Sequence, residues 1–106
     1  MSLKGTTQDI KWGKDLCFCI REKMYSVQGM EPDMPGASFK TSPEEFDHLM
    51  SRNGIRPAPY LARHHWVLVE DLDALSRGEW ETYLRLSYDL VVAKLPKRVQ
   101  REIQED

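Results

Sequence analysis

The first strongly apolar part of the chain is residues 16–20, which read Leu-Cys-Phe-Cys-Ile and are apolar at every position. Residues 21–23 are polar, and residues 24–27 then contain a methionine, a tyrosine and a valine. Two such runs around a short polar interruption predict two strands joined by a tight hairpin. Residues 29–36 contain two prolines and two glycines and are expected to form a loop, and residues 37–40 are expected to form a third strand or its edge.

The sequence around Ser42 has the pattern of a helix start. Ser42 suits the N-cap, Pro43 suits the first helical position, and Glu45 follows the cap by three residues, as in a capping box. The apolar stripe of this helix is formed by Phe46, Leu49 and Met50. Gly54 suits the left-handed position that follows a helix, so we expect the helix to end at residues 53–54.

The second half of the chain alternates between strand and helix patterns. Residues 65–70 are rich in β-branched and aromatic side chains and predict a strand, whereas residues 55–62 contain two prolines and cannot form a regular helix. A broad apolar face at helical spacing then predicts the longest helix, through Trp80, Leu84, Ser87, Tyr88 and Val91. Pro96 ends this helix, and the later spacing of Val99 and Ile103 predicts a short terminal helix.

These elements predict an α+β fold with two layers, an antiparallel sheet with helices packed on one of its faces. The chain has 106 residues, which suffice for a single domain with one modest core. Residues 1–14 are mostly polar and have Trp12 as their only aromatic anchor, so we expect this segment to be a leader or tail. The single domain is expected to span residues 15–106.

Charge and cysteine content narrow the class of protein. Fifteen Lys and Arg oppose seventeen Asp and Glu, and this net charge of −2 argues against a uniformly basic surface. No apolar run approaches the roughly 18–20 residues that cross a bilayer, so we expect no membrane association. Cys17 and Cys19 would share one face of a strand at a spacing that opposes a disulfide, and two thiolates cannot complete a zinc site. We therefore expect buried reduced thiols and a cytoplasmic protein.

The residue types that carry catalysis form no recognisable constellation. His64 and His65 are adjacent, so on a strand they would point to opposite faces and could not share a metal ion. His48 has no second ligand at helical spacing, and the acidic residues gather near predicted helix starts, where the helix dipole favours them. No glycine-rich phosphate loop is present in the sequence. We therefore expect a non-enzymatic domain without a metal ion or cofactor.

Basic residues are segregated into two segments that contain no carboxylate. Residues 52–65 contain three arginines and two histidines, and residues 94–101 contain two lysines and two arginines. If the two segments face the same way, an acidic protein presents one positive surface to a polyanion. The alternative explanation is a solvated loop and helix end, because cations are favoured in the last turn of a helix.

Five short segments together resemble the MmcQ/YjbR family. In chain order they are Glu22-Lys23-Met24-Tyr25, Asn53-Gly54-Ile55-Arg56-Pro57-Ala58-Pro59-Tyr60-Leu61, His65-Trp66-Val67, Ser87-Tyr88-Asp89-Leu90 and Leu95-Pro96-Lys97. The resemblance implies a frataxin-like (CyaY-like) fold and DNA binding through a double-wing surface, and it carries no catalytic residues. It also implies a helix before the first strand, for which residues 1–15 are too short and polar. Either the chain is truncated or a partner covers the exposed face.

Two functions follow from these observations as hypotheses. The first is a DNA-binding domain, active as a monomer or weak dimer, with phosphate contacts from Lys23, Arg56, Arg63, Lys94, Lys97 and Arg98. The second is a protein-interaction or small-ligand-binding module, which would use an aromatic cleft around Tyr60, Trp66 and Tyr88. Against the second stands the general tendency of large aromatic side chains to pack in cores.

Overall fold

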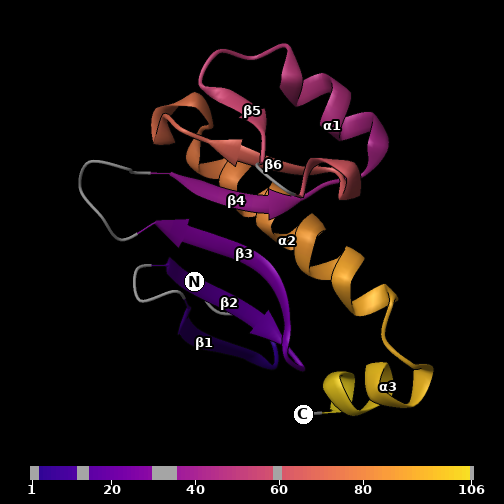
Figure 1. The fold of residues 1–106 in the computed structure, drawn as a ribbon. Coiled ribbons are helices and arrows are strands. Elements are labelled where there is room, and N and C mark those ends of the chain that lie inside the picture. The colour runs from indigo at the N-terminus through magenta and orange to yellow at the C-terminus, as the bar shows by residue number, and fades with distance from the viewer. Residues whose placement is uncertain (1–2, 12–14, 30–35, 59–60, 106) are drawn as a thin grey trace.

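The computed structural model describes residues 3–11, 15–29, 36–58 and 61–105. Its elements are β1 (Thr6–Lys11), β2 (Asp15–Ile20), β3 (Lys23–Gly29), β4 (Ala37–Lys40), α1 (Pro43–Met50), β5 (Ile55–Pro57), the 3-10 helix η1 (Ala62–His64), β6 (Trp66–Val69), the 3-10 helix η2 (Leu72–Ala74), α2 (Arg77–Ala93) and α3 (Lys97–Glu105). The strands form one antiparallel sheet in the order β1-β2-β3-β4-β6-β5 (Figure 1). The predicted α+β class and antiparallel sheet are confirmed.

The helices cover one face of the sheet, as predicted. In Figure 1, α2 runs diagonally behind the strands, with α1 above it and α3 beyond its end. One core cluster joins α1, α2 and the β4-β6-β5 side of the sheet, and it contains Phe39, Leu49, Ile55, Val67, Val69, Leu75 and Tyr83. A second joins β2 and β3 to the end of α2 and to α3, and it contains Ile20, Tyr25, Tyr88, Val91 and Ile103. The core therefore lies between the sheet and α2.

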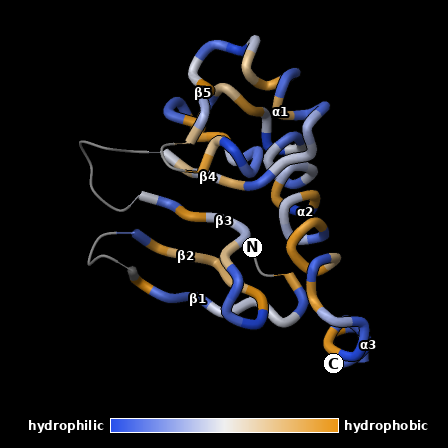
Figure 2. Tube along the Cα trace, turned by 45° about the vertical axis from the view of Figure 1, so that its right-hand side comes forward, coloured by the Kyte–Doolittle hydropathy of each residue, from blue (hydrophilic) through white to orange (hydrophobic). Residues whose placement is uncertain are grey.

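The N-terminal segment differs from the expected tail. Residues 6–11 form β1, an edge strand that pairs with β2 along its whole length, from Thr6 opposite Ile20 to Lys11 opposite Asp15. Figure 2 shows the largely hydrophilic β1 beside the more hydrophobic β2. Main-chain hydrogen bonds hold such a strand without a buried side-chain face, so its polar sequence carries no strand signal. The predicted anchor Trp12 lies outside the described residues.

The hairpin of β2 and β3 is confirmed, and its turn uses Arg21 and Glu22, both with positive φ. The pairing register shifts between Phe18 and Cys19, which leaves Tyr25 of β3 as the extra residue of a β-bulge. Cys17 and Cys19 are both buried on β2, as expected. The predicted loop after this hairpin falls mostly on residues 30–35, outside the described part of the chain.

The start of α1 is confirmed only in part. The Ser42 side chain accepts a hydrogen bond from the Glu45 main-chain N–H at 3.3 Å, and Pro43 occupies the first turn. The Glu45 carboxylate, however, accepts a hydrogen bond of 2.7 Å from the Tyr83 hydroxyl of α2. The expected capping contact is thus replaced by a link between the two helices. The helix ends earlier than predicted, at Met50, and Gly54 takes its left-handed φ of +86° immediately before β5.

Candidate nucleic-acid interface

The six predicted phosphate-binding residues are all exposed. They lie on separate elements: Lys23 begins β3, Arg56 is on β5, Arg63 is in η1, Lys94 is the C-cap of α2, and Lys97 and Arg98 begin α3. Whether they act together therefore depends on how the fold places these elements.

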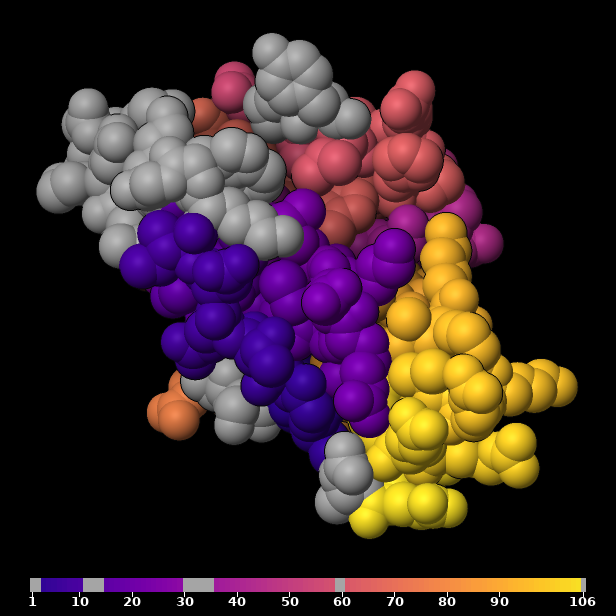
Figure 3. All heavy atoms as spheres, turned by 60° about the horizontal axis from the view of Figure 1, so that its bottom comes forward, coloured from indigo at the N-terminus to yellow at the C-terminus, as the bar shows by residue number. Residues whose placement is uncertain are grey.

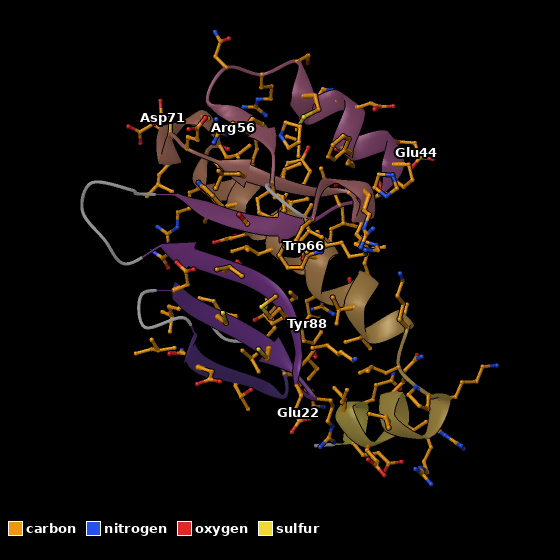
Figure 4. The ribbon with its side chains drawn as sticks, viewed as in Figure 1. Glu22, Glu44, Arg56, Trp66, Asp71 and Tyr88 are labelled. Atoms are coloured by element: carbon orange, nitrogen blue, oxygen red, sulfur yellow. The ribbon has the colours of Figure 1, made fainter. Side chains whose placement is uncertain are left out.

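Arg56 lies apart from the other predicted cations. It belongs to the outermost strand of the sheet, and its Nε lies 3.5 Å from a carboxylate oxygen of Glu70. Figure 4 shows Arg56 beside Asp71 at one end of the molecule, while Glu22 and α3 lie at the other end. An arginine with acidic neighbours at the far edge of the sheet is a poor contributor to a shared positive surface.

Lys23 lies at the α3 end of the molecule. The neighbouring Arg21 forms an ion pair of 3.8 Å with Glu102 of α3. Figure 3 shows the end of α2 and α3 side by side with the first strands. The structure thus places Lys23 near the α3 cations, but with Glu102 and the exposed Glu22 among them.

The two carboxylate-free segments meet at Lys40, a residue that the sequence analysis did not identify. Lys40 is the last residue of β4, and its Nζ donates a hydrogen bond of 3.0 Å to the main-chain carbonyl of His64 in η1. The charge of Lys94, the C-cap of α2, also acts on the Lys40 ammonium group: burial, followed by the Lys94 charge, lowers the pKa of Lys40. Lys40 therefore lies between the two carboxylate-free segments, residues 52–65 and residues 94–101.

The backbone that carries Lys40 is held by α2. The Lys40 main-chain N–H donates a hydrogen bond of 2.9 Å to the Ser87 hydroxyl, which in turn donates one of 2.5 Å to the carbonyl of Tyr25. Ser87 and Lys94 are seven residues apart, which places them on one side of the helix. The contact that anchors α2 to the end of β4 thereby also brings Lys94 toward Lys40.

The histidines are placed differently from the prediction. His64 is in η1 rather than on a strand, and His65 has a left-handed φ of +64° immediately before β6. The Thr41 hydroxyl and main-chain N–H both donate hydrogen bonds of 2.9 Å to the His65 carbonyl. The strand geometry assumed for this pair is therefore wrong, and the tight turn positions the His64 carbonyl for Lys40.

Acidic side chains bound this region. Glu44 and Glu45 open α1 just after Lys40, and Figure 4 shows Glu44 at that end of α1. Asp89 on α2 is bonded to Arg85, with its Oδ1 3.1 Å from the arginine Nε. In the described part of the chain, no carboxylate forms an ion pair with Lys40, Arg63 or Lys94. The positive region is consequently local and small.

The predicted aromatic cleft is not formed by the two of its residues that the structure describes. Trp66 and Tyr88 are buried, with 6% and 5% of their surfaces exposed. Tyr88 packs edge-on against Tyr25 at 5.4 Å between ring centroids, and its hydroxyl donates a hydrogen bond to the Lys4 carbonyl. Tyr60 lies outside the described residues. Tyr88 therefore packs in the core, and Trp66 is buried, so neither ring lines an open cleft.

The described residues contain neither a potential metal-ion site nor a helix suited to span a membrane. No three His, Cys, Asp or Glu side chains among them lie close enough to hold a metal ion. None of the helices in this part of the chain is both long and apolar enough to span a membrane.

Comparisons with known proteins agree with this architecture. The model of the YjbR family matches residues 1–90, which includes β1 and ends before α3. The Deinococcus radiodurans protein DR2400, described as a DUF419 domain, has a crystal structure that superposes with a TM-score of 0.86 at 24% identity, covering 97% of this chain and 80% of that one. A Pseudomonas syringae protein gives a TM-score of 0.65 at 24% identity, covering 80% of this chain and 86% of that one. No curated protein matches the sequence significantly.

Proposed function

The chain belongs to the YjbR family, and on this premise we propose that it is a non-enzymatic, cytoplasmic DNA-binding domain. Its phosphate contacts come from a surface that we call the Lys40 surface. This surface consists of Lys40, Arg63, Lys94, Lys97 and Arg98. It is narrower than the surface expected from the sequence, because Arg56 and Lys23 lie among carboxylates.

The observation that carries the proposal is the position of Lys40 between η1 and α2: its Nζ donates to the His64 carbonyl, and its main-chain N–H donates to the Ser87 hydroxyl. The positive charges of Lys40 and Lys94 repel each other, which costs free energy in the unbound protein. A phosphate that bridges them offsets the repulsion and forms charge-assisted hydrogen bonds with both. The exposed Arg63 and the first turn of α3 extend the positive charge on either side of this pair.

The small size of the Lys40 surface sets the expected behaviour. Five phosphate contacts correspond to a log-log slope of affinity against salt of about −4.5, or about a 500-fold loss of affinity between 50 and 200 mM salt. Contacts of this type go to the sugar-phosphate backbone and carry no base information. We therefore expect binding to duplex DNA with little sequence preference.

Fluorescence anisotropy with a labelled mixed-sequence duplex tests the proposal. The double variant K40Q/K94Q should weaken binding and reduce the salt slope by about 2, since each lysine accounts for about one released counterion. The matched control is the double variant R56Q/R77Q, which removes the same charge from two exposed arginines that are each paired with a glutamate. It should leave the salt slope unchanged.

Two results would contradict the proposal. Absence of binding at tens of micromolar protein in about 50 mM salt would exclude DNA binding, because even non-specific complexes form in this range. Equal effects of K40Q/K94Q and R56Q/R77Q would show that any binding depends on net charge and not on the Lys40 surface.

A further inference from the structure

A pocket of about 270 Å³ lies between the helix-covered face of the sheet and the start of α2. It is separate from the Lys40 surface and shares no residue with it. The sheet side of the pocket includes Phe18, Ser26 and Gln28, and the helix side includes Leu72, Trp80 and Leu84. Neither the YjbR family match nor the hypotheses drawn from the sequence assign this pocket a role.

The walls of the pocket are held in place by specific contacts. The Trp80 indole N–H donates a hydrogen bond of 3.0 Å to the Leu72 carbonyl, which ties η2 to α2. The same indole ring packs edge-on against the buried Phe39, with 5.9 Å between ring centroids. On the opposite wall, the bulge between β2 and β3 turns both Tyr25 and Ser26 toward the helices. The space is therefore built by the fold and does not arise from a loosely placed side chain.

The chemistry of the walls defines the kind of ligand. None of the described lining residues is charged, and most are apolar or aromatic. Ser26 donates its hydroxyl hydrogen to the Ser38 carbonyl at 3.1 Å, so the lone pairs of its oxygen remain available to accept a hydrogen bond. The exposed Gln28 side chain adds an amide at the same wall. Such a site favours a neutral molecule with an apolar body and one hydrogen-bond donor.

The size of the pocket further limits which ligand it can bind. An apolar cavity of about 150 Å³ accommodates benzene, so a space of this size accommodates a bicyclic ring. Leu72 is 45% exposed beside the pocket, which is a large exposure for an apolar side chain that a bound ring would cover. We propose that this pocket binds a neutral bicyclic aromatic compound that stacks between Phe18 and Trp80 and donates one hydrogen bond to Ser26 or Gln28.

Titration with indole, followed by two-dimensional NMR of the labelled full chain, tests this proposal. Indole has the required shape, no charge and one N–H donor. We expect shifts at the Trp80 indole N–H and at the amides of Ser26, Gln28 and Leu72, with a dissociation constant of about 1 mM or tighter. Absence of shifts at these positions up to about 5 mM indole would overturn the proposal.

Two variants and a control test whether indole binds in this pocket. Q28F places a ring at the exposed rim and L84F fills the helix side, and each should weaken indole binding at least tenfold. T7F is the matched control, because Thr7 is an exposed strand residue outside the pocket. Equal affinity of Q28F, L84F and T7F would overturn the assignment of the site. Because K40Q/K94Q should bind indole normally, this result is independent of the DNA-binding test.

Discussion

The Ser87 hydroxyl of α2 donates a hydrogen bond to the main-chain carbonyl of Tyr25, which lies 62 residues earlier in the chain. The same oxygen accepts a hydrogen bond from the Lys40 N–H, so Ser87 bridges β3 and β4 beyond their last paired residues, Ser26 and Phe39. The helix thereby supplies the contact that the sheet ladder lacks at this point. The Ser-Tyr pair in α2, one of the segments that resemble the MmcQ/YjbR family, thus has a structural role.

Replacing Ser87 with alanine should destabilise the fold. The S87A variant leaves a main-chain N–H and a carbonyl without their partner at a fully buried position, which costs about 1–3 kcal/mol. Urea unfolding measures the change. The control is S51A, because the exposed Ser51 hydroxyl bonds only to the His48 carbonyl one turn before it. We expect S51A to change the free energy of unfolding by less than about 0.5 kcal/mol, and equal effects of the two variants would contradict the bridging role.

Two glycines should respond in opposite ways to alanine. Gly54 has a φ of +86°, and a Cβ there would lie 3.0 Å from the Cβ of Asp71 and 3.3 Å from that of Ala74. G54A should therefore lower the free energy of unfolding by about 1–3 kcal/mol. Gly78 lies in the first turn of α2 with no atom within 4 Å of an added Cβ, so G78A should raise it by up to about 1 kcal/mol. Thermal unfolding of both variants checks the signs, and stabilisation by G54A would refute the steric argument.

The contact between Arg52 and Glu79 should make the stability of the fold depend on pH in the acid range. The Arg52 guanidinium donates to both Glu79 oxygens, and this hydrogen bonding, together with the Ser76 main-chain N–H, lowers the pKa of Glu79 from 4.5 to about 2. A carboxyl with a lowered pKa in the folded state stabilises the fold above its unfolded pKa. That contribution is lost as the pH falls from about 4.5 to about 2.

The melting temperature measured across this acid range tests the contact. The E79Q variant should melt lower than the wild type at neutral pH and show a shallower decline between about pH 4.5 and 2. E81Q is the control, because Glu81 forms only an exposed pair of 3.8 Å with Arg77. A profile of E79Q that runs parallel to the wild type would exclude Glu79 as the titrating group.

The hydrogen bond between Tyr83 and Glu45 should make the stability of the fold depend on pH in the alkaline range. Burial and the hydrogen bond to the Glu45 carboxylate raise the pKa of Tyr83 from 10.0 to about 12. The neutral phenol is therefore favoured in the folded state, and its contribution is present below pH 10 and lost as the pH rises toward 12. The difference in ultraviolet titration between wild type and Y83F isolates this group. A difference curve centred near pH 10 would show that the hydroxyl is not held by Glu45.

Elements can be predicted from the sequence where local patterning and tertiary burial agree. The apolar run of β2, the cap at Ser42 and the helical spacing of Trp80 to Val91 each mark an element whose side chains enter the core. The strand β1 was not predicted, because an edge strand with polar side chains is held by main-chain hydrogen bonds that no side-chain pattern reports. The hydrogen bond between Glu45 and Tyr83 was not predicted either, since a partner 38 residues away competes with the local cap.

At the candidate site, the two carboxylate-free segments of the sequence contain Arg63, Lys94, Lys97 and Arg98, but neither contains Lys40. Lys40 lies between Phe39 and Thr41 and has no other cation beside it in the sequence. Its Nζ reaches the His64 carbonyl, and the Lys94 charge lowers its pKa, only because α2, β4 and η1 converge. Arg56 belongs to the same basic segment as Arg63, yet the short β5 carries it to the outer edge of the sheet.

The amino-acid pattern alone determined the α+β class, the hairpin, the principal helices and the identity of most exposed cations, because propensity and hydrophobic period act within a few residues along the chain. Tertiary structure decided which cations share a surface, which hydroxyl bridges β3 and β4, and where a pocket lies between sheet and helix. Those properties depend on distances between residues far apart in sequence, and packing sets these distances only when the whole sheet and its covering helices are assembled.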